Sequence, residues 1–303
     1  MSGDLFETAS QLALEPKQFL GIPIALTGAV FLSIGAQLQH RGVTKVESTN
    51  PGAGGGLSLR QLALLLARPS WVIGTLMLGL AVVFQLASLV PSPLIVVQPL
   101  GAVALVITAI INSKVTKTAL NRQSIIAISL CVGGVALFVL VAAFTARDLP
   151  VNNNQLILIL LILAGVLVAF GVFFALLRKR FKAIFYIIGA GVLYGFVVTL
   201  AKTVIARITQ GDVDWLLVVG VIALLAAAGV GGYFVQNAYS SGPPDLVIAG
   251  LTVIDPLVAV TIGIVILQEA TQAPLWAGIA FVVAGAIAIW GVFLLARHHP
   301  QIS

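Results

Sequence analysis

The residues that could carry chemistry are few, and the most informative is an acidic side chain in a long apolar run. Asp255 lies about twelve residues into the stretch 244–267, within Ile254-Asp255-Pro256-Leu257. A carboxylate in such a run is costly to bury and by default functional. We expect it either to carry a proton or to ligate a cation, which makes it the single metal ligand predicted for this chain. The alternative is a purely structural role, in which Asp255 only hydrogen-bonds the backbone of the helix that Pro256 interrupts.

A second polar group occupies the corresponding place earlier in the chain. Gln98 precedes Pro99 as Asp255 precedes Pro256, and each proline is expected to break its helix. Gln98 either coordinates a hydrated ion or polar solute, or hydrogen-bonds a neighbouring helix. Lys202 either pairs with Asp255 or an anionic substrate, or extends its ammonium to the membrane interface by snorkelling. The choice between helix–helix hydrogen bonding and substrate contact also applies to three more polar residues, Gln85, Gln236 and Asn237.

The composition places these residues in a lipid bilayer. Of 303 residues, 60% are hydrophobic and 9% charged, whereas soluble proteins contain about 25% charged residues. A spanning helix needs roughly 20 apolar residues. Nine stretches qualify, at about 19–39, 70–90, 93–112, 123–145, 155–177, 183–206, 214–238, 244–267 and 274–296. We therefore predict an all-α polytopic membrane protein.

Several classes of function are disfavoured. The single cysteine, Cys131, gives no disulfide framework and no cysteine metal site. No Ser/His/Asp or Cys/His arrangement suggests an enzyme, and the glycines 229–232 are followed by Tyr233 rather than by the Lys-Ser or Lys-Thr of a phosphate-binding loop. The basic residues lie between apolar stretches, which argues against nucleic acid as a partner. We expect no cofactor, and the sequence leaves the oligomeric state open.

The basic residues predict the orientation in the membrane. With nine spans, three of the sixteen Lys and Arg lie on the amino-terminal side, Lys202 lies in a span, and the other twelve lie on the opposite side. Lys and Arg concentrate in cytoplasmic loops. The amino terminus is therefore expected outside, and the carboxyl terminus in the cytoplasm, of a protein in the plasma membrane.

The chain also contains an internal repeat. Val97-Gln98-Pro99-Leu100 in the third stretch matches Ile254-Asp255-Pro256-Leu257 in the eighth. Spans one to four and six to nine thus form two repeats, and the single fifth span between them gives the second repeat the opposite orientation in the membrane. Inverted repeats are typical of secondary transporters, which bind substrate near the midplane between their halves. The predicted units are a tail or interfacial helix (1–18), a first repeat (19–145), a linker span (146–182), a second repeat (183–296) and a cytoplasmic tail (297–303).

The stretch from Phe84 to Gly134 carries a family resemblance. Its segments Ala87-Ser88-Leu89-Val90-Pro91 and Leu94-Ile95-Val96-Val97-Gln98-Pro99-Leu100-Gly101-Ala102 resemble the drug/metabolite transporter superfamily, and within it the NIPA-like magnesium transporters. The resemblance implies about nine spans, an external amino terminus and uptake of a divalent cation, magnesium. Asp255 before Pro256 departs from the family pattern.

Two alternatives to magnesium uptake stay open. The first is proton-coupled export of a small organic metabolite, a drug or a lipid-linked intermediate, with Asp255 as the titrating group. The second is a membrane scaffold or assembly subunit without transport activity. The inverted repeat argues against the scaffold, because a passive anchor needs no pair of inverted halves.

Overall fold

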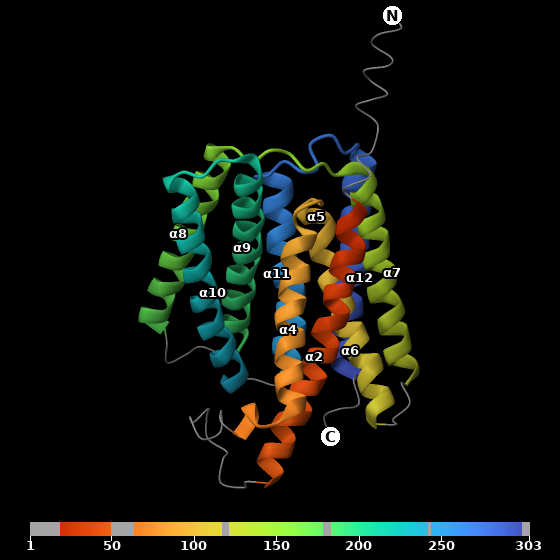
Figure 1. Ribbon diagram of the computed structural model, residues 1–303. Helices are drawn as coiled ribbons and strands as arrows, with labels where there is room; N and C mark the ends of the chain where they lie inside the picture. The colour runs from red at the N-terminus through yellow and green to blue at the C-terminus, as the bar shows by residue number, and fades with distance from the viewer. Residues whose placement is uncertain (1–18, 50–63, 117–120, 178–182, 242–243, 299–303) are drawn as a thin grey trace, which may run out of the picture.

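The computed structural model describes residues 19–49, 64–116, 121–177, 183–241 and 244–298, and these residues form helices joined by short connections, with no strand among them (Figure 1). Nine of the helical segments are long and apolar enough to cross a bilayer, which confirms the predicted all-α polytopic architecture. The elements are α2 (Gly21–Thr49), α4 (Pro69–Ser88), α5 (Leu94–Val97), η2 (Gln98–Leu100), α6 (Gly101–Thr116), α7 (Arg122–Thr145), α8 (Asn153–Leu177), α9 (Ala183–Gln210), α10 (Trp215–Ser241), α11 (Pro244–Val265) and α12 (Leu275–His298).

Two spans differ from the predicted stretches. α2 continues well past residue 39 to Thr49, so its span is the first part of a longer helix. The third span is divided into α5, the short 3-10 helix η2 and α6. Pro99 explains the division, because it has no backbone N–H to donate and its ring crowds the preceding turn. The predicted tail or interfacial helix at 1–18 lies outside the described residues.

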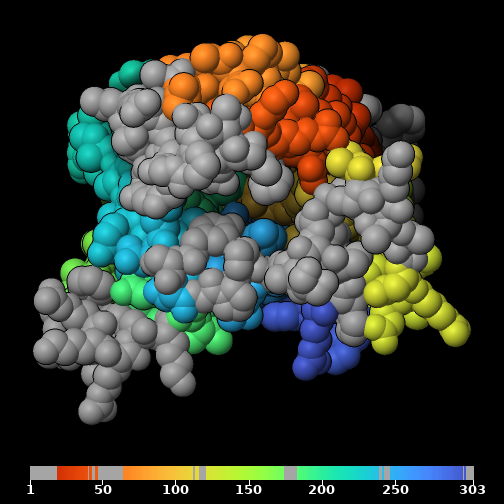
Figure 2. Space-filling view, turned by 90° about the horizontal axis from the view of Figure 1, so that it is seen from below, coloured from red at the N-terminus to blue at the C-terminus, as the bar shows by residue number. Residues whose placement is uncertain are grey.

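Close helix pairs give the bundle its order. α2 packs against α4 and α6, while α9 packs against α10 and α11, and α7 pairs with α12. Glycines allow these approaches: a Cβ on Gly74 of α4 would lie 2.6 Å from the backbone nitrogen of Gln39, and one on Gly134 of α7 would lie 2.5 Å from that of Ala288. Seen from the end, α2 and α4 lie along one edge, with the last helix near the opposite edge (Figure 2).

The two sets of four spans run in opposite directions. α2 starts at the end of the bundle where α9 finishes, and the first helix of each set packs on the next two spans of that set (Figure 1). This agrees with the predicted inverted repeat. We call this end the hairpin end; it carries the connections 89–93, 146–152, 211–214 and 266–274.

Candidate functional site

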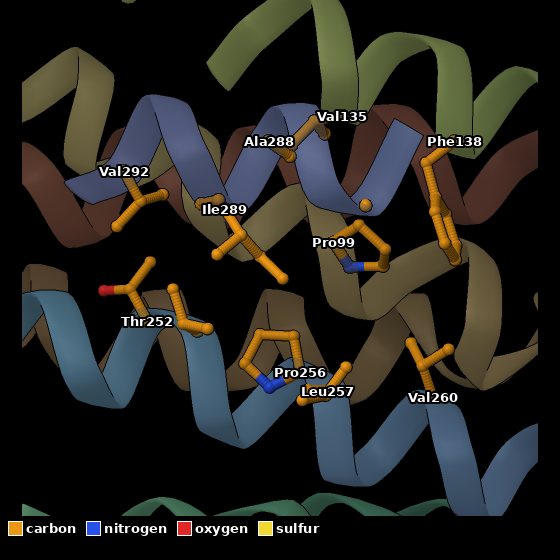
Figure 3. Close-up of a pocket in the computed structure, with 13 residues that line it drawn as sticks. Pro99, Val135, Phe138, Thr252, Pro256, Leu257, Val260, Ala288, Ile289 and Val292 are labelled. Carbon is orange, nitrogen blue, oxygen red and sulfur yellow. The ribbon is translucent and has the colours of Figure 1, made fainter. Parts of the chain in front are cut away.

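The interrupted third span and α11 border a small apolar cavity. Its volume is about 90 Å³, and its walls come from α6, α7, α11, α12 and η2 (Figure 3). Pro99 and Pro256 both line it, so the two proline positions predicted to be equivalent meet at one place. The remaining lining residues are mostly aliphatic and include Thr252, whose carbonyl oxygen has no helical donor because residue 256 is a proline.

The two prolines affect their helices differently. Pro99 lies within η2, where the span changes from α-helix to 3-10 helix. Pro256 lies inside α11, which continues as one α-helix from Pro244 to Val265. The expected helix break is therefore present at Pro99, whereas at Pro256 the helix loses one hydrogen bond and does not end.

Asp255 is the only acidic residue within the nine spans of the described chain, and it lies near the middle of its span. Its Oδ1 atom is buried and has no hydrogen-bond partner. The residue packs against α9: a Cβ on Gly195 would lie 3.0 Å from the Asp255 carbonyl oxygen, and one on Gly191 would lie 3.5 Å from its nitrogen.

Gln98 is the second polar side chain of this region that lacks a partner. It begins η2, is 4% exposed, and its Nε2 atom makes no hydrogen bond. Neither Gln98 nor Asp255 is among the residues that line the apolar cavity, so a shared cavity for the two stays a prediction. Together they offer an acceptor and a donor that a bound ion or polar solute would satisfy.

The snorkelling predicted for Lys202 is wrong. The residue is 2% exposed, and its ammonium donates to the carbonyl oxygens of Leu89 at 2.8 Å and Ser92 at 2.9 Å and to Asp148 Oδ2 at 2.7 Å. Its ion-pair partner is thus Asp148, and the alternative pairing with Asp255 is wrong as well. The connections 89–93 and 146–152 cover the end of α9 and supply three acceptors, which satisfies an ammonium without water.

Glu269 is a buried carboxylate that sequence reasoning missed. It is 2% exposed and accepts hydrogen bonds from the backbone nitrogens of Leu94 at 2.8 Å and Ile95 at 2.9 Å. The first backbone N–H groups of a helix have no partner within it, so Glu269 caps α5 from the connection after α11. The signal in the sequence was an acidic residue beside the apolar run, but nothing local identified its distant partner.

The other predicted polar residues lie on α4 and α10. Gln85 is half-buried on α4, whereas Gln236 is exposed on α10. Asn237 donates from Nδ2 to the carbonyl oxygen of Tyr233, one turn earlier in its own helix, at 2.8 Å. Gln236 is therefore not buried in a helix–helix contact.

A dehydrated metal ion has no ready-made cage in the described part of the chain. Among its residues, no group of three or more His, Cys, Asp and Glu side chains could hold a metal ion. Asp255 alone offers one carboxylate. Mg²⁺ keeps several of its waters and is often held through one or two carboxylates, so a hydrated ion is the form that suits such a position.

Comparison with known proteins supports part of the family resemblance. No protein-family profile and no solved structure matches the chain. An uncharacterized protein of Corynebacterium glutamicum is 26% identical over 285 residues, which cover 92% of this chain and 95% of that protein. The Arabidopsis thaliana protein named Probable magnesium transporter NIPA4 is 32% identical over 121 residues, 40% of this chain and 34% of its own length. The chain is thus a multi-span membrane protein with distant, partial similarity to a NIPA protein.

Proposed function

We propose that this membrane protein is a secondary transporter or facilitator of the drug/metabolite transporter type, and that it mediates uptake of a divalent cation, magnesium. The observation that carries the proposal is Asp255. It is the one acidic residue in the described spans, and its buried Oδ1 lacks a partner. An ionisable residue at this depth marks a substrate or ion pathway more often than a structural role.

The energetics favour passive, potential-driven uptake. An inside-negative potential of 100 mV supplies about 2.3 kcal/mol per elementary charge, hence about 4.6 kcal/mol for a divalent ion. This suffices for roughly a thousandfold accumulation without proton coupling. The partial similarity to the Arabidopsis protein, whose name states magnesium transport, supports the same substrate.

The orientation belongs to the same proposal. We place the hairpin end outside and the opposite end in the cytoplasm of the plasma membrane. α2 and α6 both end opposite the hairpin end (Figure 1), and the last parts of these helices contain the exposed basic residues Arg41, Lys45 and Lys114. The positive-inside rule then accounts for the charge asymmetry, and uptake runs from the hairpin end inward.

A second candidate function is export of a small organic solute coupled to protons. The apolar cavity bordered by Pro99 and Pro256 favours it, because its walls suit a hydrocarbon group better than a hydrated ion. In that version Asp255 is the group that titrates during the cycle. The two versions differ in what happens when the carboxylate is neutralised.

Asp255→Asn in proteoliposomes with an entrapped magnesium indicator tests the proposal. A potassium diffusion potential, inside negative, should drive Mg²⁺ into vesicles that hold the wild-type protein. Removing the carboxylate should lower this uptake on the order of a hundredfold at every pH, because truncating one partner of a buried charge interaction costs a few kcal/mol. Asp212→Asn removes the same charge from an exposed position of the connection 211–214 and should leave uptake unchanged.

The outcomes separate the two candidate functions. Wild-type uptake no faster than that of protein-free vesicles would overturn magnesium transport. If Asp255→Asn abolishes pH-driven accumulation of an organic solute but preserves its exchange across the membrane, Asp255 couples protons. If Asp255→Asn and Asp212→Asn both match the wild type in magnesium uptake, Asp255 is a structural hydrogen-bonding group.

A further inference from the structure

Glu269 connects three separate parts of the hairpin end. Its carboxylate accepts hydrogen bonds from Leu94 and Ile95 at the start of α5. Its backbone nitrogen donates to the Gly263 carbonyl oxygen at 3.0 Å, and its carbonyl oxygen accepts from the Arg147 nitrogen at 2.8 Å. One buried residue thus holds together the end of α11, the connection 146–152 and the start of α5.

Lys202 makes a second set of bonds across the same end. From α9 it bonds the carbonyl oxygens of Leu89 and Ser92 and the carboxylate of Asp148. The Ser92 hydroxyl oxygen in turn accepts from the nitrogen of Gly21, the first residue of α2, at 3.1 Å. We call Glu269, Lys202 and Asp148 the hairpin latch. Glu269 and Lys202 belong to the predicted second repeat, and their partners in 89–95 belong to the first.

We propose that Glu269 is a proton-binding residue that controls opening of the hairpin end: its carboxyl group binds α5 in the closed form, and it is released into water when the two repeats separate. This rests on the proposed transport function, in which each end must open in turn. The structure is the closed form of this end, because Lys202 and Glu269 are each 2% exposed.

The environment of Glu269 differs between the two forms. Burial raises the pKa of Glu269 to about 7, against the lowering effects of the Ile95 and Leu94 hydrogen bonds and the Lys202 ammonium; Asp148 adds a further increase. Lys202 from α9 and Asp148 from the connection 146–152 are the charged groups that act on it. Once hydrated in the open form, the carboxyl returns to its ordinary pKa of about 4.3.

The sign of the pH dependence follows from these two pKa values. The closed form holds the proton more tightly, so protonation favours closure at a pH between the two values. As the pH rises through about 7, the closed form loses this advantage. The closed-to-open ratio should fall by up to about two orders of magnitude between pH 4 and pH 8.

Accessibility of a cysteine below the latch measures this opening directly. Thr199 is 0% exposed and lies one helical turn below Lys202 on the same face of α9. In purified protein in nanodiscs, a water-soluble maleimide should label Thr199→Cys faster as the pH rises from 5 to 8. Dividing by the labelling rate of Val213→Cys, which is 73% exposed at the same end, removes the pH dependence of the thiol itself. The normalised rate should increase at least about tenfold, with its midpoint near pH 7.

Two variants of the latch test the assignment to Glu269. Glu269→Gln does not titrate, so the labelling of Thr199→Cys should lose its pH dependence. Its level at all pH values reports the closed form with one of the two N–H bonds to α5, because an amide oxygen accepts and an amide nitrogen does not. Asp148→Asn removes a negative charge beside Glu269 and leaves the Lys202 ammonium unpaired. Both effects lower the proton affinity of Glu269, so the midpoint should move to lower pH. Asp212→Asn, an exposed charge change at the same end, should reproduce the wild-type curve.

The proposal is overturned if wild-type labelling does not depend on pH, if Glu269→Gln keeps the wild-type curve, or if Asp148→Asn leaves the midpoint in place. The second variant keeps the test decisive when Glu269→Gln does not fold. Labelling requires no substrate and no transport. Failed magnesium uptake with pH-dependent labelling therefore contradicts only the proposed function, whereas normal uptake with pH-independent labelling contradicts only the role of Glu269.

Discussion

Replacing Lys202 by methionine tests whether a buried ammonium holds the hairpin end together. The Lys202 side chain is 3% exposed, and its ion pair with Asp148 has a length of 2.7 Å. Two of its three hydrogen bonds go to the backbone carbonyl oxygens of Leu89 and Ser92. Methionine keeps an unbranched apolar chain of similar length and removes all three donors.

The cost can be estimated from these contacts. Removing one partner of a buried ion pair destabilises a protein by about 3–5 kcal/mol. Asp148 is 30% exposed and regains water when Lys202 is lost, which places the ion-pair loss near or below the lower limit. The two carbonyl oxygens each lose a hydrogen bond of about 1 kcal/mol. With about 2 kcal/mol from the two carbonyl oxygens and up to about 3 kcal/mol from the ion pair, we expect a total loss of about 3–5 kcal/mol, or roughly a hundredfold to a few thousandfold in the unfolding equilibrium.

Reversible unfolding in mixed micelles, with increasing SDS, measures this difference. Lys114→Met is the matched control, because Lys114 is exposed on α6 and surface changes usually stay within about 0.5 kcal/mol. Asp148→Asn and the double variant complete a mutant cycle. The two residues are in direct contact, so the coupling energy should be about 1–3 kcal/mol.

The result that refutes this reasoning is equal stability of Lys202→Met and Lys114→Met. Such a result would place the Lys202 ammonium in water, as snorkelling requires. A cycle without coupling, together with a large effect of Lys202→Met, would instead assign the stabilisation to the carbonyl oxygens of Leu89 and Ser92 alone.

Two further predictions concern packing and topology. Gly195→Ala should cost about 1–3 kcal/mol by overpacking in the same unfolding assay, because its Cβ would lie 2.7 Å from that of Val258. The control Gly79→Ala, whose Cβ would have nothing within 4 Å, should not destabilise the protein. An equal effect of both variants would contradict the close contact of α9 with α11. Reporter fusions at the two ends of the chain should report opposite sides of the membrane, and the same side would contradict nine spans.

The spans could be predicted because hydropathy and length decide them locally. A helix in lipid must satisfy its own backbone, so about 20 apolar residues suffice to identify it. The departures have local physical causes as well. α2 extends to Thr49 because a helix can continue beyond the bilayer. Counting consecutive apolar residues identifies only the part of the helix that lies in lipid.

The hairpin latch could not be predicted, because its bonds join distant residues. Glu269 is separated from Ile95 by 174 positions and Lys202 from Asp148 by 54. The sequence shows each charge beside or within an apolar run, but not which connection folds over which helix. The sequence suggested Asp255 as a partner for Lys202 because both residues lie in spans. In the structure Lys202 lies at the hairpin end, whereas Asp255 lies near the middle of its span.

The different outcomes at the two prolines also depend on the surroundings. Pro99 follows a helix of four residues, whose first N–H groups are held by Glu269 rather than by a preceding turn. The span can change to a 3-10 helix there at little cost. Pro256 has α-helical turns on both sides, so α11 loses only the bond to Thr252 and continues. Prolines at equivalent positions of the two repeats therefore need not give the same backbone.

The unsatisfied polar atoms lie mainly away from the hairpin latch. Three buried side-chain atoms of the described residues lack a partner: Gln98 Nε2, Asp255 Oδ1 and Arg207 Nε. Arg207 is otherwise held by Asn153 and Asp214, and the three donors of Lys202 are all used. Leaving a buried polar atom unpaired costs about 1–3 kcal/mol, which a bound solute can offset. The unpaired atoms of Gln98 and Asp255 therefore support the proposed substrate contact, and the fully bonded latch supports the proposal that the hairpin end is the part that opens.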